Sequence, residues 1–216
     1  MIHELCFATR NVHKREEIAA QLGGNFRLLT LDEIGCTEEI PEPEATIEGN
    51  AAYKASYVWE RYHISCFADD SGLEVVALNG APGVHSAYYA GTNRDFKANY
   101  EMVLREMEGI SDRRAQFKTV IALVRPDSNM QLFTGVITGA ITTAPRGSNG
   151  FGYDPIFQPD GYHLTFGEMA PALKNQISHR ARAVQQLLDF LKQINGQVQL
   201  LSASTMHKMK LCTKSK

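Results

Sequence analysis

Apolar positions along this chain recur with two periods, which predict strands in some segments and helices in others. Short apolar runs that end at turn residues predict strands over residues 2–8, 63–68, 73–78, 116–124 and 130–141. Apolar residues spaced three and four apart predict helices over residues 12–22, 47–62, from the 92–95 capping box to 109, and 178–196. The sequence therefore predicts an α/β fold.

Two of these predicted connections indicate how the strands pair. The runs 116–124 and 130–141 flank Pro126-Asp127-Ser128-Asn129, which is typical of an antiparallel hairpin. The first strand instead leads through a short loop into a helix, as in a βα unit, which needs a parallel neighbour. We expect a mixed sheet.

The predicted helix over 47–62 has two different faces. Its apolar face carries Ile47, Ala51, Ala55, Val58 and Tyr62. Asn50 and Lys54 share the other face.

Length and charge limit the class of protein. A chain of 216 residues that is 44% hydrophobic can bury one substantial core, and we expect one domain over residues 1–196. Residues 197–216 have weak periodicity and a lysine-rich end, and we expect a disordered tail. A formal net charge of -2 provides no general attraction for nucleic acid, so any phosphate site has to be local. Nucleic-acid binding through the basic tail is a weaker alternative.

Targeting signals and metal-binding cysteine patterns are absent from the sequence. It contains no run of about 18 apolar residues and no N-terminal signal segment, so we expect a cytoplasmic protein without membrane contact. The four cysteines lie far apart, which favours neither a zinc site nor a disulfide scaffold: Cys6, Cys36, Cys66 and Cys212. Cys6 and Cys66 are predicted to be buried strand residues.

The segment Ala68-Asp69-Asp70-Ser71-Gly72 is interpreted as a tight turn between two strands, because Asp, Ser and Gly favour turns. Ionised carboxylates beside a core strand need a partner, and a cation is the usual one. Mg²⁺ takes only one or two carboxylates and completes its shell with water and phosphate oxygens, and Glu42 and Glu44 are possible further ligands. An ordinary turn preceded by an exposed acidic loop is the alternative.

The segment from Ala8 to Lys14 joins the first strand to the first helix. A helix N-terminus exposes unpaired N–H groups, so a triphosphate can bind there with Thr9 and Asn11 donating and Lys14 neutralising charge. The segment lacks the glycines and lysine spacing of a P-loop. The alternative is that Asn11 is a plain N-cap.

The glycine-rich segment 147–155 combines backbone freedom with aromatic side chains. Glycines let the backbone approach a flat ligand, Phe151 or Tyr153 can stack on a base, and Asp154 can accept from a ring N–H. A glycine-rich turn between two strands is the alternative.

A cluster of polar residues, Lys174 to Arg180, lies at the start of the last predicted helix. Cations near a helix N-terminus oppose the helix dipole, so their placement there needs a reason, and a bound nucleotide would provide one. The alternative is that Ser178 is an N-cap and the basic residues are solvated.

Taken together, these segments resemble the inosine/xanthosine triphosphate pyrophosphatase family. The resemblance covers about residues 2–191. Five segments in this order carry it: Ala8-Thr9-x-Asn11-x-x-Lys14, Ala68-Asp69-Asp70-Ser71-Gly72-Leu73-Glu74-Val75, Gly80-Ala81-Pro82-Gly83-Val84, Gly150-Phe151-Gly152-Tyr153-Asp154-Pro155 and Ser178-His179-Arg180. Any one of them can arise by chance, whereas five in order are hard to explain otherwise.

The resemblance implies a long mixed β-sheet with flanking helices, two lobes around a central nucleotide-binding cleft, and a homodimer. It also implies Mg²⁺-dependent hydrolysis of ITP, dITP and XTP to the monophosphate and pyrophosphate. By matching positions, it assigns Asp70, Lys14 and Lys54 to catalysis, with Asp70 as general base, and Asp70 and Glu42 to the metal. The implied substrate residues are Thr9, Asn11, Lys14, Lys54 and Ser71 for the phosphates and sugar, and Phe151, Gly152, Tyr153, Asp154, Lys174, His179 and Arg180 for the base.

The chain departs from the family pattern at three places. Tyr88 stands where the family often has an arginine, Pro43-Glu44 replaces a common Thr-Gly, and the tail extends beyond the usual end. Two other functions remain open: a house-cleaning pyrophosphatase for modified pyrimidine or methylated nucleotides, and a non-catalytic nucleotide sensor.

Overall fold

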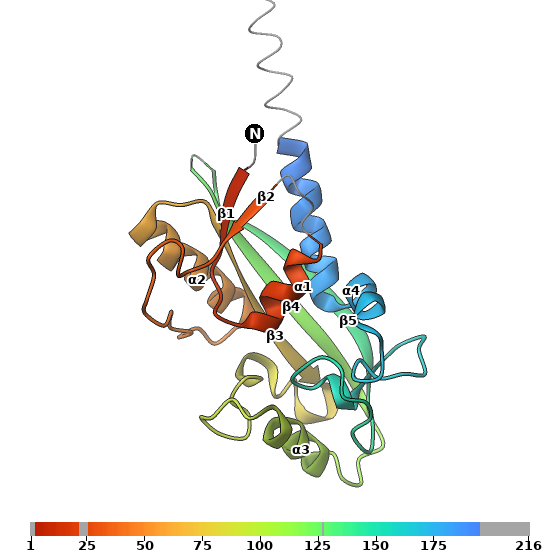
Figure 1. Cartoon of the computed structure of the whole chain (residues 1–216). Helices are drawn as coiled ribbons and strands as arrows, with labels where there is room; N and C mark the ends of the chain where they lie inside the picture. Colours follow the sequence, from red (N-terminus) through yellow and green to blue (C-terminus); the bar gives the residue numbers. More distant parts are fainter. Residues whose placement is uncertain (1–2, 22–25, 127, 195–216) are drawn as a thin grey trace, which may run out of the picture.

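The computed structural model describes residues 3–21, 26–126 and 128–194 (Figure 1). Its six strands form one mixed sheet in the order β2-β1-β3-β4-β5-β6. β1 pairs in parallel with β2 and β3, and the pairs β3–β4, β4–β5 and β5–β6 are antiparallel. The strand bounds are β1 His3–Phe7, β2 Phe26–Leu29, β3 Cys66–Val75, β4 Arg114–Val124, β5 Gln131–Ile141 and β6 Phe157–Pro159. The predicted α/β fold with a mixed sheet is confirmed.

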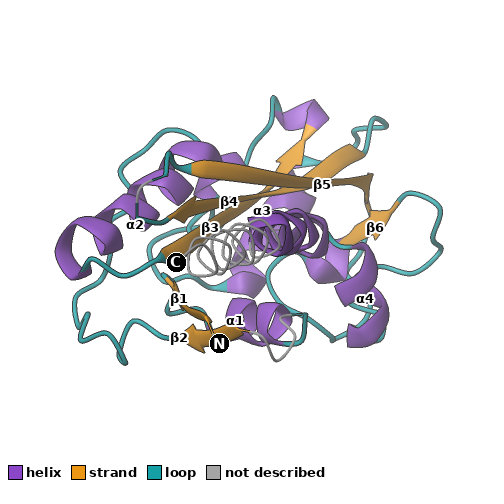
Figure 2. Ribbon diagram, turned by 90° about the horizontal axis from the view of Figure 1, so that it is seen from above, coloured by secondary structure: helices purple, strands orange, loops and turns teal. Residues whose placement is uncertain are grey.

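Helices cover both faces of this sheet. The helices are α1 Val12–Ala19, α2 Ile47–Tyr62, α3 Phe96–Glu106, α4 Pro171–Ile177 and a helix over residues 179–194, with 3-10 turns η1 Val76–Leu78, η2 Gly83–His85 and η3 Asp154–Ile156. Figure 2 shows α2 on one face of the sheet and the 179–194 helix on the other.

Side chains of β3 alternate between these two layers, because successive residues of a strand point to opposite faces. Cys66 and Ala68 pack in a core cluster with α2, whereas Phe67 packs with Leu187 of the 179–194 helix. Farther along β3, Leu73 joins a third cluster with Val103 of α3. The burial predicted for Cys6 and Cys66 is confirmed.

The interpretation of residues 69–72 as a turn is wrong. β3 continues through them, with Asp69 opposite Ile121 and Asp70 opposite Val120 of β4. Turn-forming residues tolerate the strand here because both carboxylates find cations, one on each face. Gly72 permits a close approach: a Cβ there would lie 2.2 Å from the carbonyl oxygen of Gly83.

Most of the predicted elements are present. The helix over 47–62 is α2, the hairpin is β4–β5, and the predicted capping segment ends at Asp95, whose carboxylate accepts from the N–H groups of Lys97 and Ala98. The first helix was predicted to extend to residue 22, but it ends at Ala19. The short elements β2, β6 and α4 were not predicted, because too few residues form them to give a periodic signal. The predicted tail over 197–216 lies outside the described residues.

None of the helices in the described part of the chain combines the length and apolarity that a membrane crossing requires.

Gly135 of β5 lets the 179–194 helix lie close against the sheet. A Cβ at Gly135 would lie 2.0 Å from the carbonyl oxygen of His179 and 2.6 Å from the backbone nitrogen of Ala183. We therefore expect Gly135→Ala to lower the free energy of unfolding by about 1–3 kcal/mol, because the helix has to move away. Urea unfolding measures the change. Thr134→Ala, an exposed neighbour on β5, is the control, and equal stability of the two variants would contradict the prediction.

Candidate functional site

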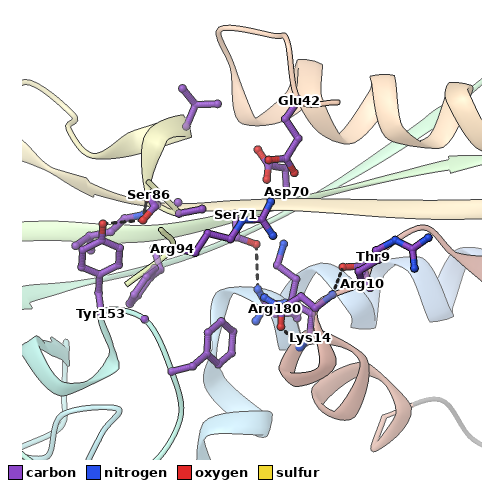
Figure 3. Close-up of a pocket in the computed structure, with 18 of the residues that line it drawn as sticks. Thr9, Arg10, Lys14, Glu42, Asp70, Ser71, Ser86, Arg94, Tyr153 and Arg180 are labelled. Carbon is purple, nitrogen blue, oxygen red and sulfur yellow. Dashed lines mark hydrogen bonds between the residues drawn. The ribbon is translucent and has the colours of Figure 1, made fainter. Parts of the chain in front are cut away.

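One pocket collects residues from segments that lie far apart in the chain (Figure 3). They include the β1–α1 loop, the loop before α2, the middle of β3 with α2 behind it, the segment from η2 to the start of α3, the glycine-rich loop, and the junction between α4 and the 179–194 helix. All of the candidate site residues assigned from the sequence line it: Thr9, Asn11, Lys14, Glu42, Lys54, Asp70, Ser71, Phe151, Gly152, Tyr153, Asp154, Lys174, His179 and Arg180. Glu44 is exposed and does not line it.

Asp69 is the anchor of an ion-pair chain on one face of β3. Its carboxylate accepts from Lys14 Nζ at 3.0 Å and from Arg180 Nε at 3.2 Å, and its side chain is fully buried. Burial alone would raise the pKa of Asp69, but Lys14 and Arg180 outweigh it and bring that pKa to about 2. Asp69 is therefore ionised and saturated with partners, and it holds two pocket cations in place.

The chain of ion pairs continues through Glu17 of α1. Glu17 binds Arg180 through one carboxylate oxygen and Lys174 Nζ, at 2.8 Å, through the other. Lys174 also donates to Asp154, which is buried and accepts from the backbone N–H of Phe151 at 2.8 Å. This network ties α1, the glycine-rich loop and α4 together around the pocket.

Asp70 lies on the opposite face of β3, with Lys54 and Glu42. Lys54 Nζ is 2.6 Å from Glu42 Oε1 and 3.5 Å from Asp70 Oδ1. Burial raises the pKa of Asp70, and the negative charges of Glu42 and Asp69 add to this effect, against the opposing influence of Lys54 and Lys14. Asn50 and Lys54 are both buried although they are polar, and Lys54 lines the pocket.

Asn11 is the N-cap of α1, which was predicted as the alternative to a phosphate site. Its side chain accepts from the backbone N–H of Lys14 at 3.2 Å, and its own N–H donates to the Thr9 hydroxyl. The cap and a ligand site are compatible, because Thr9, Asn11 and Lys14 all line the pocket.

The aromatic residues of the glycine-rich loop differ in their freedom. The Tyr153 ring is buried in the third cluster, and its hydroxyl donates to the carbonyl of Ser86 at 2.8 Å. Phe151 is half-buried at the pocket wall, backed by a parallel His13 ring at 5.2 Å. Gly150 is required for the loop: a Cβ there would lie 2.0 Å from Asp154 Oδ2. Of these two aromatic residues of the loop, Phe151 is the one available to a ligand.

His179 and Arg180 begin the 179–194 helix, and Ser178 caps it by accepting from the N–H of Ala181. Burial lowers the pKa of His179 well below its usual value, and Arg180 and Lys174 add to this, so its imidazole is neutral. The ring stacks on Phe117 at 4.6 Å, and its buried Nδ1 has no hydrogen-bond partner among the described residues. A buried polar atom without a partner in a pocket is suited to a ligand.

The sequence did not indicate the roles of Glu17, Arg10 or Arg94. Arg10 donates to Asp32 and to the carbonyls of Cys36 and Glu38, and it borders the pocket. Glu17 lies one helical turn after Lys14, which could have suggested a shared helix face.

The donor set for a metal is small. In the described residues, no group of three or more His, Cys, Asp or Glu side chains could hold a metal ion. Glu42 and Asp70 nevertheless converge on one cation, the Lys54 ammonium. Two carboxylates fit Mg²⁺ when phosphate oxygens and water complete its coordination.

Comparisons with known proteins cover most of the chain. Residues 5–190 match the Ham1 family. The chain is 52% identical over 191 residues to a dITP/XTP pyrophosphatase from Porphyromonas gingivalis, across 88% of this chain and 98% of that protein. A dITP/XTP pyrophosphatase from Flavobacterium johnsoniae is 48% identical across 87% of this chain and 97% of its own length. The structure of the Staphylococcus aureus Ham1 protein matches with a TM-score of 0.82 at 37% identity, covering 88% of this chain and 98% of that one.

Proposed function

Because this chain belongs to the Ham1 family, we propose that it is a dITP/XTP pyrophosphatase, which hydrolyses non-standard purine nucleoside triphosphates to the monophosphate and pyrophosphate. The observation that carries this proposal is the composition of the pocket. It joins a helix N-terminus with Lys14 and Lys54, which suit phosphates, to Phe151, His179 and Arg180, which suit a purine base.

In the proposed reaction, Asp70 acts as the general base. It takes a proton from a water molecule, whose oxygen forms a bond to the α-phosphorus while the bond from that phosphorus to the bridging oxygen breaks and pyrophosphate leaves. Burial, which raises the pKa of Asp70, makes it a stronger base than an exposed aspartate. Lys14 and Lys54 offset the negative charge that develops on the phosphates.

We propose that Glu42 and Asp70 bind Mg²⁺ together with the substrate phosphates. Their convergence on Lys54 supports this, because a site that already holds one cation between two carboxylates has the charge to attract another. Bound there, the ion would lower the pKa of a coordinated water and offset phosphate charge.

Selectivity for the base would come from hydrogen bonding. Hypoxanthine and xanthine present a 6-keto acceptor, to which Arg180 and the N–H group of the neutral His179 imidazole can donate. Adenine presents an amino donor there, which would leave the donors of Arg180 and His179 unpaired. Two such mismatches could give discrimination on the order of 10²–10⁴.

We also propose that the two ends of the sheet act as lobes of a single domain over residues 1–196, with the nucleotide in a cleft between them, and that the protein forms a homodimer. Separate core clusters on α2 and on α3 support the two lobes.

The test is pyrophosphate release from ITP, dITP, XTP, GTP and dATP, each with Mg²⁺ and with excess EDTA. We expect release from ITP, dITP and XTP with Mg²⁺, at least about 100-fold less from dATP, and none with EDTA. Faster cleavage of modified pyrimidine triphosphates would favour the related house-cleaning activity instead. Binding without pyrophosphate release would favour a nucleotide sensor.

A further inference from the structure

Arg94 is a pocket residue that the proposed function leaves without a role. It lines the pocket from the loop between η2 and α3, and in Figure 3 it lies on the side opposite Thr9 and Lys14. Arg94 also lies near Glu42. Burial alone would raise the pKa of the Glu42 carboxyl, but the positive charges of Lys54, Lys14 and, more weakly, Arg94 lower it.

The backbone of Arg94 is held in an uncommon conformation. Three non-glycine residues in the described part of the chain have positive φ: His63, Asn79 and Arg94. His63 and Asn79 are C-caps, where left-handed backbone is ordinary, whereas Arg94, with φ 50°, precedes the N-cap of α3. Left-handed backbone outside a cap costs free energy and is often retained at functional sites.

The side chain of Arg94 packs on Tyr88 and forms an ion pair with an exposed carboxylate, Glu39. Its guanidinium lies over the Tyr88 ring at 4.8 Å from the centroid, and its Nε donates to the Tyr88 hydroxyl. Tyr88 is 39% exposed, and its contacts with Arg94 give this exposed ring a role. The carboxylate partner of Arg94 is Glu39, at 3.2 Å, whose side chain is 75% exposed.

The other cations of the pocket are bound more firmly. Lys14, Lys174 and Arg180 pair with carboxylates that are 0–14% exposed, Lys54 pairs with Asp70 and Glu42, and Arg10 donates to three oxygens. An ion pair with a mostly exposed carboxylate contributes little stability. Arg94 can therefore exchange its partner at lower cost than the other cations.

We propose that Arg94 is a substrate-binding residue, which leaves Glu39 and binds a phosphate group of the nucleotide from the side of the pocket opposite Lys14. This inference rests on the proposed function, because it needs a phosphorylated substrate. A guanidinium is suited to the role, since it presents parallel N–H donors to phosphate oxygens. Tyr88 is the residue that positions it.

The test measures kcat and KM for ITP hydrolysis in four variants. Arg94→Ala should raise KM about tenfold, the loss expected for one charge-assisted hydrogen bond, and Arg94→Lys should recover part of it. Glu39→Gln should lower KM about twofold to fivefold, because it removes the competing carboxylate. Arg105→Ala, an exposed arginine of α3 outside the pocket, is the matched control and should leave both constants unchanged.

The opposite signs separate substrate binding from a structural clasp. If Arg94 and Glu39 only hold two loops together, both substitutions raise KM or neither changes it, and either result overturns the inference. A KM for Arg94→Ala within twofold of wild type also overturns it. Absence of ITP hydrolysis by the wild-type protein would instead refute the proposed function.

Discussion

Asp70→Asn should lower kcat for ITP hydrolysis by about 10³-fold while changing KM little, because asparagine fills the same space but cannot accept a proton. The substitution also removes one of the two carboxylates proposed to hold Mg²⁺. Steady-state pyrophosphate release at saturating Mg²⁺ measures kcat, and equilibrium binding of ITP checks that the site still forms.

Glu44→Gln is the matched control for this experiment. Glu44 lies in the same acidic loop as Glu42 but is exposed and does not line the pocket, so its kcat should equal that of wild type. A kcat of Asp70→Asn within tenfold of wild type would show that another group takes the proton.

Asp69→Asn should reduce stability more than Gly135→Ala does. It leaves Lys14 without its carboxylate and deprives Arg180, which is 2% exposed, of one of its two. Removing one partner of a buried ion pair costs about 3–5 kcal/mol, because the remaining charge stays out of water. For a protein of this size the melting temperature should fall by about 6–20 °C.

Asp70→Asn is the natural comparison for stability, because it makes the same chemical change at the next residue on the other face of β3. Lys54 then keeps Glu42 at 2.6 Å, and Asp70 gains little from its charge in the folded state, so we expect a loss below about 1 kcal/mol. Equal losses for the two variants would contradict the asymmetry between the two faces.

The stability that Asp69 provides should depend on pH in the acid range. Its pKa is about 2 in the folded protein, below the ordinary value of 3.8, so the folded state favours the ionised form. The contribution is therefore complete above about pH 5 and is lost as the pH falls toward 2. Urea unfolding from pH 6 to pH 2.5 should show the difference between wild type and Asp69→Asn shrinking, and a constant difference would refute this.

Local sequence patterns were sufficient for the larger elements, and the family resemblance selected most of the polar side chains of the site but missed Arg10 and Arg94. Periodicity located α2 and the β4–β5 hairpin, since each is long enough to repeat its pattern several times. The order of the motifs selected side chains that the structure brings into one pocket. Short elements such as β2 and α4 were not predicted, because a few residues are too few to show a repeating pattern of apolar positions.

The tertiary structure alone decided what each of these side chains contacts. The sequence placed Asp69 and Asp70 together, yet the strand turns them to opposite faces, so one anchors cations and the other is available for chemistry. Asp69 meets Arg180 across 111 residues of chain, and Arg94 reaches Glu39 across 55. Such pairs depend on strand register and helix packing, which are set by the burial of the whole core and not by any local pattern.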